Sequence, residues 1–244
     1  SAFVTGSVAI WIGTGQATMT VVPRLLDAGK TVGVIEAGKF GGTCVNHGCT
    51  PTKTLVASEY AVNMARRGDA FGFSTNDVVV DFSSVMDTQK TNRQGSSSWI
   101  ENRLESMEGC TAFRGEGIFI DRKTVQVADH RLTAANIVVH AGTRPRKPEI
   151  QGLDSVKWLS NESILDLDEL PSHLVVVGGG YIALEFAQIF RRLGSQVTIV
   201  IRGGSVLRRE DKDIRRAVEG VLASEGIEII RNCRVNEISP VNGV

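Results

Sequence analysis

The sequence predicts an α/β fold in which one strand–turn–helix–strand unit occurs twice. Three observations lead to this prediction: a glycine-rich turn follows an apolar run near the N-terminus, the same arrangement returns far down the chain, and the 244 residues suffice for two ordinary domains. Basic and acidic residues balance at 27 each, so no net field attracts nucleic acid or an anionic membrane. Specific small-molecule sites are favoured instead.

The first copy lies at the N-terminal end. Its strand, glycine turn, helix and second strand are predicted at residues 8–12, 13–15, 16–28 and 31–35. Gly29 closes the helix, and the second strand ends in Glu36.

The second copy has the same parts in the same order. They are predicted at residues 174–177, 178–180, 182–193 and 197–200. The strand-end residue lies 23 positions after the first glycine in both copies, Glu36 after Gly13 and Ile201 after Gly178. This internal repeat predicts two Rossmann-like dinucleotide-binding domains, parallel sheets flanked by helices, in which a pyrophosphate sits on the N–H groups of a helix N-terminus. The alternative is two glycine-rich turns in an ordinary α/β fold.

The first copy departs from the ideal fingerprint at three positions. Thr18 replaces a third glycine, Trp11 crowds a strand that should be buried on both faces, and Pro23 falls inside the helix. These departures count against dinucleotide binding at this copy.

The residues after the second strand differ between the copies. Glu36 can accept hydrogen bonds from a ribose diol, which Ile201 cannot. Arg202, Arg208 and Arg209 instead offer donors suited to a 2′-phosphate, which favours NADP over NAD at the second copy. A solvated basic loop is the alternative.

The chain has four cysteines, of which Cys44 and Cys49 are close in sequence. No apolar run reaches the roughly 18 residues that span a bilayer, so we expect a cytoplasmic protein, where a close pair indicates redox chemistry or metal ligation. No second cysteine pair or histidine cluster completes a tetrahedral set, so no metal site is expected. A helix beginning near Val45 would favour a thiolate at Cys44. Cys110 and Cys233 are expected to be small buried residues.

Residues 41–53, GGTCVNHGCTPTK, resemble the active-site signature of the pyridine nucleotide–disulfide oxidoreductases, which include dihydrolipoamide dehydrogenase, glutathione reductase and mercuric reductase. The resemblance continues through residues 114–117, 141–145 and 178–185 and spans essentially the whole chain. The TPTK form and residues 161–165 are most similar to mercuric reductase-like proteins.

The resemblance implies an incomplete FAD-binding domain over residues 1–148 with a small antiparallel insert, and an incomplete NAD(P)-binding domain over residues 149–244. It implies FAD contacts from Gly13, Gly15, Gln16, Glu36, Gly42, Thr43, Lys53, Gly117 and Gly142. It implies NADPH contacts from Gly178, Gly180, Tyr181, Ile182, Arg202 and Arg208.

The resemblance also implies the reaction. Hydride would pass from NADPH to FAD and on to a disulfide of Cys44 and Cys49, with Cys49 against the flavin and Cys44 attacking a disulfide or Hg(II)-type substrate. Lys53 would lie near the flavin and pair with Glu185, while Tyr181 would cover the nicotinamide pocket. The alternatives are a non-catalytic or truncated dinucleotide-binding fragment and a diaphorase that passes electrons to a dye or quinone without the thiols.

Two positions depart from the family pattern. His140 begins a His-Ala-Gly run where the family usually has Ala-Thr-Gly, and His47 replaces a usual valine; each is compatible with a tolerated packing change. The chain starts without methionine and stops soon after a strand-like segment, so we expect the N-terminal part of a longer, homodimeric protein whose C-terminal interface domain is absent here.

Overall fold

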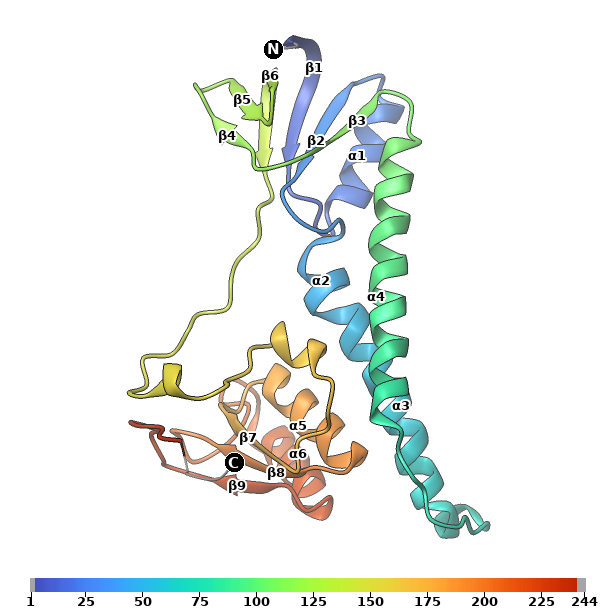
Figure 1. The fold of residues 1–244 in the computed structure, drawn as a ribbon, viewed down its shortest axis with the longest axis vertical. Coiled ribbons are helices and arrows are strands. Elements are labelled where there is room, and N and C mark those ends of the chain that lie inside the picture. The colour runs from blue at the N-terminus through green and yellow to red at the C-terminus, as the bar shows by residue number, and fades with distance from the viewer. Residues whose placement is uncertain (1–2, 241–244) are drawn as a thin grey trace. The chain divides into compact units, whose positions relative to one another are not determined.

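A computed structural model describes residues 3–240 (Figure 1). The chain forms two compact units. Within the described residues, the first comprises the chain up to residue 51 together with 90–144, and the second comprises 52–89 together with the chain from 145 onward. Residues 52–89 thus pack with the C-terminal part of the chain. The expected FAD-binding domain over residues 1–148 and NAD(P)-binding domain over residues 149–244 stay predictions.

The first unit contains a six-stranded sheet in the order β3-β2-β1-β6-β5-β4. Strands β1, β2, β3 and β6 are parallel, whereas β4 and β5 pair in antiparallel fashion, which is the small antiparallel insert that the sequence predicted. The strands are β1 (Phe3–Ile12), β2 (Val32–Glu36), β3 (Cys110–Arg114), β4 (Ile118–Phe119), β5 (Thr124–Val127) and β6 (His130–Val139).

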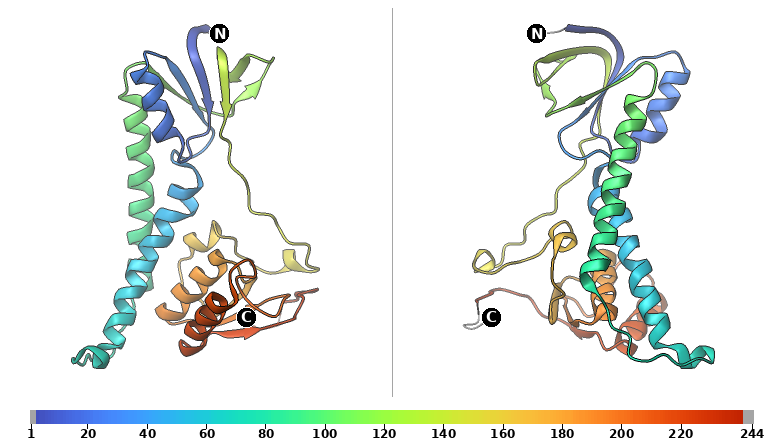
Figure 2. Two further views of the ribbon diagram at one scale, coloured as in Figure 1. Left: turned by 180° about the vertical axis from the view of Figure 1, so that it is seen from behind. Right: turned by 45° about the vertical axis from the view of Figure 1, so that its right-hand side comes forward.

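Helices cover one face of this sheet. Helix α1 (Thr18–Asp27) and the C-terminal half of α4 (Phe82–Glu105) lie side by side in every view, and the short α2 (Gly42–His47) follows β2 (Figure 2). Consecutive residues of β1 face opposite sides of the sheet. Trp11 packs in a cluster with residues of α1 and α4, and Ile10 packs in a cluster with residues of β5 and β6. The centre of this sheet, β2 and the end of β1, is therefore buried on both faces, as the inner strands of an α/β sheet are.

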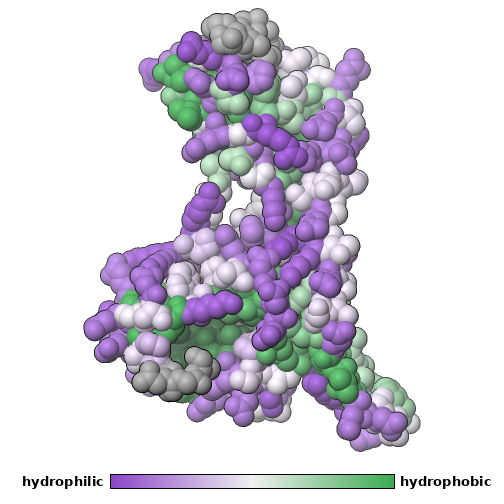
Figure 3. Space-filling model, in the orientation of Figure 1, coloured by the Kyte–Doolittle hydropathy of each residue, from purple (hydrophilic) through white to green (hydrophobic). Residues whose placement is uncertain are grey.

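The second unit contains the parallel sheet β7-β8-β9. Its elements are most of α3 (Cys49–Arg66), η1 (Gly68–Phe71), the start of α4, η2 (Leu153–Ser155), η3 (Ser163–Asp166), β7 (His173–Val177), α5 (Tyr181–Leu193), β8 (Gln196–Val200), α6 (Lys212–Ser224) and β9 (Glu228–Ile230). Its core joins apolar residues of α5, such as Phe190 and Leu193, to the sheet residues Val197 and Ile199. Val175, Val177 and Ile230 are exposed, and hydrophobic residues gather over this sheet in Figure 3.

The predicted strands and helices of both copies are present, with ends shifted by a few residues. Helix α1 continues through Pro23 without a break. The segment around the cysteine pair is built differently from the expectation: a helix begins at Gly42 rather than near Val45, and a second one begins at Cys49. Between residues 3 and 240, no helix is long and apolar enough to cross a membrane.

Candidate active site and nucleotide-binding turns

Cys44 and Cys49 form a disulfide, and their Cα atoms lie 4.6 Å apart. Gly48 lies between the two helices, where an added Cβ would lie 3.1 Å from the Thr43 carbonyl oxygen and 3.3 Å from Cys44 Cα. The buried Asn46 holds the short helix against the preceding loop, because its Nδ2 donates to the Phe40 carbonyl at 2.9 Å. The sequence did not single out Asn46, because its burial and its hydrogen bonds are visible only in the fold.

The two cysteines differ in their position on the helices. Cys49 is the first residue of the 18-residue α3, so the unsatisfied N–H groups of that helix favour a thiolate at Cys49. Cys44 instead lies inside the six-residue α2. This helix begins two residues before Cys44, earlier than expected, and a favoured thiolate at Cys44 stays a prediction.

A pocket of about 490 Å³ opens beside Cys44. Its lining comes from α1 and the turn before it, α2, the start of α3, and α4: Gly15, Gln16, Met19, Cys44, Val45, Thr50, Gly95, Ser96, Trp99 and Ile100. Among the described lining residues none carries a charge. Trp99 is 61% exposed and was not anticipated, because nothing in the sequence of α4 connects it to the cysteine pair. The pocket gives a small molecule access to the Cys44 side of the disulfide.

Glu36 fixes the first glycine turn. Its Oε2 accepts hydrogen bonds from the Thr14 backbone N–H at 2.9 Å and from Thr14 Oγ1 at 2.5 Å, and its Oε1 accepts from the Gly38 N–H at 2.8 Å. The Gly41 N–H in turn donates to Thr14 Oγ1 at 2.9 Å. A carboxylate accepts about four hydrogen bonds, so Glu36 keeps capacity for a ribose hydroxyl while it orders the turn.

Two of the departures from the ideal fingerprint compensate each other. The buried Trp11 donates from Nε1 to Thr18 Oγ1 at 2.8 Å, and the Thr18 hydroxyl donates to the Gly13 carbonyl at 3.2 Å. The indole and the hydroxyl therefore tie β1, the turn and α1 together where a third glycine would only allow close packing. Trp11 and Thr18 thus stabilise the turn, and whether their departure from the fingerprint weakens dinucleotide binding at this copy stays a prediction.

The first turn and the helix start packed on it depend on glycines. Gly13 and Gly42 adopt φ values of +99° and +61°, which favour glycine. A Cβ on Gly42 would lie 2.7 Å from Gly15 Cα, and one on Gly15 would lie 2.5 Å from His140 Nε2. Gly117 packs close to β1 and β2, whereas Gly142 faces open space. With Glu36 at the strand end, these residues fit the pyrophosphate and ribose of FAD.

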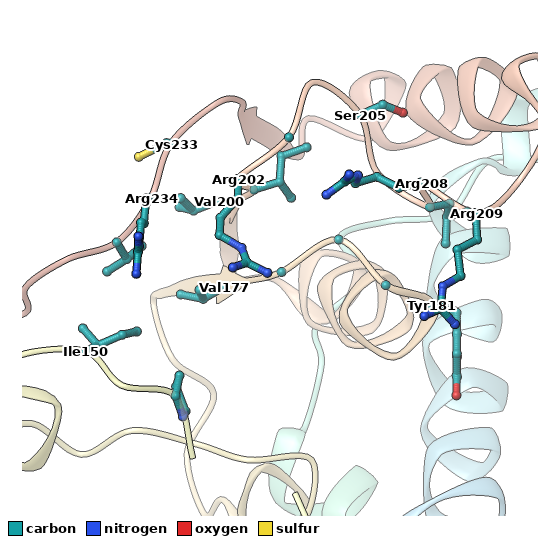
Figure 4. Close-up of a pocket in the computed structure, with 18 of the residues that line it drawn as sticks. Ile150, Val177, Tyr181, Val200, Arg202, Ser205, Arg208, Arg209, Cys233 and Arg234 are labelled. Carbon is teal, nitrogen blue, oxygen red and sulfur yellow. The ribbon is translucent and has the colours of Figure 1, made fainter. Parts of the chain in front are cut away.

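The second turn opens into a pocket of about 720 Å³ (Figure 4). Gly178 adopts a φ of +124°, and no heavy atom of the described residues, apart from its chain neighbours, lies within 4 Å of a Cβ added to Gly180. Arg202 and Arg208 extend into the same space, while Arg209 lies beside Tyr181 (Figure 4).

The second pocket also contains residues that the sequence did not indicate. Arg146, Cys233 and Arg234 join its lining from segments before and after the βαβ unit. Ile201 is 4% exposed and packs against the turn, where its side chain would lie 2.8 Å from a Cβ on Gly179. The Ile201 side chain offers no acceptor to a ribose diol, whereas the arginines that line the same pocket offer several donors to a phosphate.

Lys53 and Glu185 form the ion pair that the sequence predicted. Lys53 follows Cys49 by one turn of α3, and Glu185 lies in the second turn of α5. The pair connects the cysteine-bearing helix to the helix after the second glycine turn. Its place beside a flavin stays a prediction.

Cys110 has a chemical environment unlike that of the pair. Burial raises the pKa of the Cys110 thiol to about 11, so it is protonated at neutral pH and weakly nucleophilic. Within the part of the chain that the structure describes, no three His, Cys, Asp or Glu side chains gather in a way that could hold a metal ion.

The comparisons with known proteins agree with this geometry. A family model described as pyridine nucleotide-disulphide oxidoreductase matches residues 7–244. A mercuric reductase of Lysinibacillus sphaericus is 31% identical over 93% of this chain and 42% of its own length. A probable pyridine nucleotide-disulfide oxidoreductase of Escherichia coli, RclA, is 34% identical over 95% of this chain and 50% of its own.

A solved structure described as the Cu(II) complex of the HOCl-induced flavoprotein disulfide reductase RclA from Escherichia coli matches with a TM-score of 0.86 and 30% identity. The match covers 98% of this chain and 52% of that one. The chain thus spans about half the length of the relatives that it matches.

Proposed function

This chain belongs to the pyridine nucleotide-disulphide oxidoreductase family, and on that premise we propose that the whole protein is an NADPH-dependent FAD enzyme that reduces its own Cys44–Cys49 disulfide and passes the electrons to a small acceptor. The acceptor is a disulfide or Hg(II) bound by thiols. The observation that carries the proposal is the disulfide itself, with Cys49 at the start of a long helix and Cys44 at a pocket.

FAD, when bound, supplies the two-electron relay between NADPH and the disulfide. The residues of the first unit would hold it: the turn around Gly13 and Gly15 receives the pyrophosphate, Glu36 a ribose hydroxyl, and Thr43 and Gly117 the remaining contacts. Lys53, held by Glu185, would place a positive charge near the flavin, which favours negative charge on the ring.

The reduced cysteines then perform thiol–disulfide exchange. The Cys44 thiolate attacks one sulfur of a disulfide substrate in the pocket, which breaks the substrate S–S bond and releases one thiolate. The Cys49 thiolate attacks Cys44 Sγ, which re-forms the protein disulfide and releases the second thiol. Two electrons leave the cysteine pair and two substrate thiols form. The favourable thiolate position of Cys49 at the start of α3 suits this second step.

The function is tested with Cys44→Ser in the whole protein. NADPH oxidation is followed with three acceptors: a disulfide, thiol-bound Hg(II) and a dye. We expect the substitution to abolish disulfide reduction and to leave dye reduction, because a dye takes electrons directly from the flavin. Cys110→Ser is the matched control and should retain both activities.

Two outcomes would contradict the proposed function. Disulfide or Hg(II) reduction that survives in Cys44→Ser would contradict the thiol mechanism and favour a diaphorase. A colourless preparation that takes up no added FAD would contradict flavin binding and favour a non-catalytic dinucleotide-binding protein.

The preference for NADPH is supported by the arginines of the second pocket. Arg202 and Arg208 share one space next to the turn, and the buried Ile201 replaces the acid that would bind a ribose diol. We expect a higher kcat/KM with NADPH than with NADH, and Arg202→Ala should lower the ratio of the two about tenfold or more. Equal kcat/KM values before substitution would contradict this assignment.

We further propose that the whole protein is a homodimer, that it is located in the cytoplasm and that it acts on small molecules. Sedimentation of the whole protein tests the dimer, and fractionation of cells tests the location.

A further inference from the structure

The two glycine turns differ at the position where a dinucleotide comes closest. In such turns, the second glycine lets the backbone approach the pyrophosphate. At Gly180 the space of a Cβ is open: no heavy atom of the described chain, apart from its neighbours, lies within 4 Å. At Gly15 the same space holds the His140 ring, with Nε2 at 2.5 Å, Cδ2 at 3.0 Å and Cε1 at 3.5 Å from an added Cβ.

The backbone and a neighbouring ring hold His140 in this place. Its N–H donates to the Ile12 carbonyl at 2.7 Å, directly after β6. Its imidazole lies against Trp11, with ring centroids 5.8 Å apart and an interplanar angle of 51°. Trp11 is in turn fixed by its hydrogen bond to Thr18. The nitrogen edge of the ring therefore faces the turn as a fixed feature of the first unit.

We propose that His140 Nε2 donates a hydrogen bond to the FAD pyrophosphate beside Gly15. This inference rests on the proposed function, because it requires FAD at the first turn. A neutral imidazole carries one N–H, and a hydrogen bond to an anionic phosphate oxygen is of the strong, charge-assisted kind. His140 is then a binding residue in which the chain departs from the Ala-Thr-Gly run of its family, and the Trp11–Thr18 pair positions it.

The proposal is tested by FAD titration of the apoprotein prepared from the whole protein. His140→Phe keeps a ring against Trp11 but removes the donor, whereas His140→Gln keeps an N–H donor at similar reach. We expect the Phe variant to weaken FAD binding about tenfold or more, and the Gln variant to stay within about threefold of the parent, as judged by quenching of flavin fluorescence.

Two further ligands separate a phosphate contact from general packing. ADP carries a diphosphate and should lose affinity in the Phe variant, whereas riboflavin carries no phosphate and should not. In the unsubstituted protein labelled with ¹⁵N-histidine, the His140 Nε2 resonance should shift with FAD and with ADP but not with riboflavin. This measurement needs no variant to fold.

The outcomes distinguish the inference from the proposed function. If FAD binds the Phe variant as tightly as the parent, or more tightly, the ring only packs against the turn; the inference is then overturned and the proposed function stands. If the His140 Nε2 resonance does not shift when FAD binds, the inference is likewise overturned and the proposed function stands. If the parent apoprotein takes up no FAD, both are overturned.

Discussion

The two glycine turns have the same spacing and the same place in a strand–helix–strand unit, yet their surroundings are opposite. Protein groups fill the first turn: Glu36 accepts hydrogen bonds from Thr14, and His140 lies against Gly15. The second turn is open at Gly180 and bordered by arginines. The two turns thus share a backbone pattern set by their glycines, while the side chains around the glycines set what each turn presents to a ligand.

The helix after each turn is also anchored differently. Helix α1 is tied near its start by the hydrogen bond between Trp11 and Thr18. Helix α5 is tied near its end, where Arg192 pairs with Glu59 at 2.8 Å and with Glu225 at 2.6 Å. The Glu59 side chain is only 3% exposed. The stability of the two anchors can therefore be compared by substitution.

The largest effect is expected for Arg192→Met. It leaves Glu59 buried without its cation, so the free energy of unfolding should fall by about 3–5 kcal/mol in urea denaturation. Arg231→Met, which breaks a more exposed pair with Glu219, should cost less than about 1 kcal/mol. If both variants lose the same free energy of unfolding, the buried ion pair contributes no more to stability than the exposed one.

The free energy of unfolding that Arg192→Met loses should depend on pH. Burial raises the pKa of the Glu59 carboxyl above its ordinary value, and Arg192 opposes that rise. A carboxyl whose pKa is higher in the folded than in the unfolded state favours folding most below its unfolded pKa, and this contribution is lost as pH rises through the folded value. Removing Arg192 raises that pKa further, so the loss of stability should be larger at pH 8 than at pH 5. A loss independent of pH would contradict an ionised Glu59 in the parent.

A smaller effect is expected for Thr18→Val at the first helix. The substitution leaves the Trp11 N–H buried without its acceptor, which should lower the free energy of unfolding by about 1–3 kcal/mol. Thr18→Ser keeps the hydroxyl and is the control, with a loss under about 1 kcal/mol expected. If Val is tolerated as well as Ser, the hydrogen bond does not anchor α1.

The smallest effect on stability is expected for Gly180→Ala. Gly180 has a φ of −84°, and its Cβ would enter open space, so the melting temperature without nucleotide should be nearly unchanged while NADPH binding weakens. Gly15→Ala is the matched contrast, because its Cβ would lie 2.5 Å from His140 and should lower the melting temperature itself. Calorimetry of both variants, with and without NADPH, tests whether the turns differ as described.

Much of this fold follows from local sequence patterns. The repeat located both βαβ units, and the family resemblance implied both the disulfide and the pairing of Lys53 with Glu185. The hydrogen bond between Trp11 and Thr18 was missed. Each residue departs from the fingerprint when judged alone, and only the fold shows that their side chains meet. Residues that reach a site from distant segments, such as Trp99 and Arg234, were missed because no spacing rule connects them to it.

The raised pKa of Cys110 has a practical consequence for following electrons through this protein. At pH 7, a thiol with a pKa of about 11 is ionised in only about one molecule in ten thousand. Alkylation of Cys110 at neutral pH should therefore be slow. Mass spectrometry that compares the label on the peptides of Cys44 and Cys49 with the label on the peptide of Cys110 then reports how far the active-site disulfide has been opened.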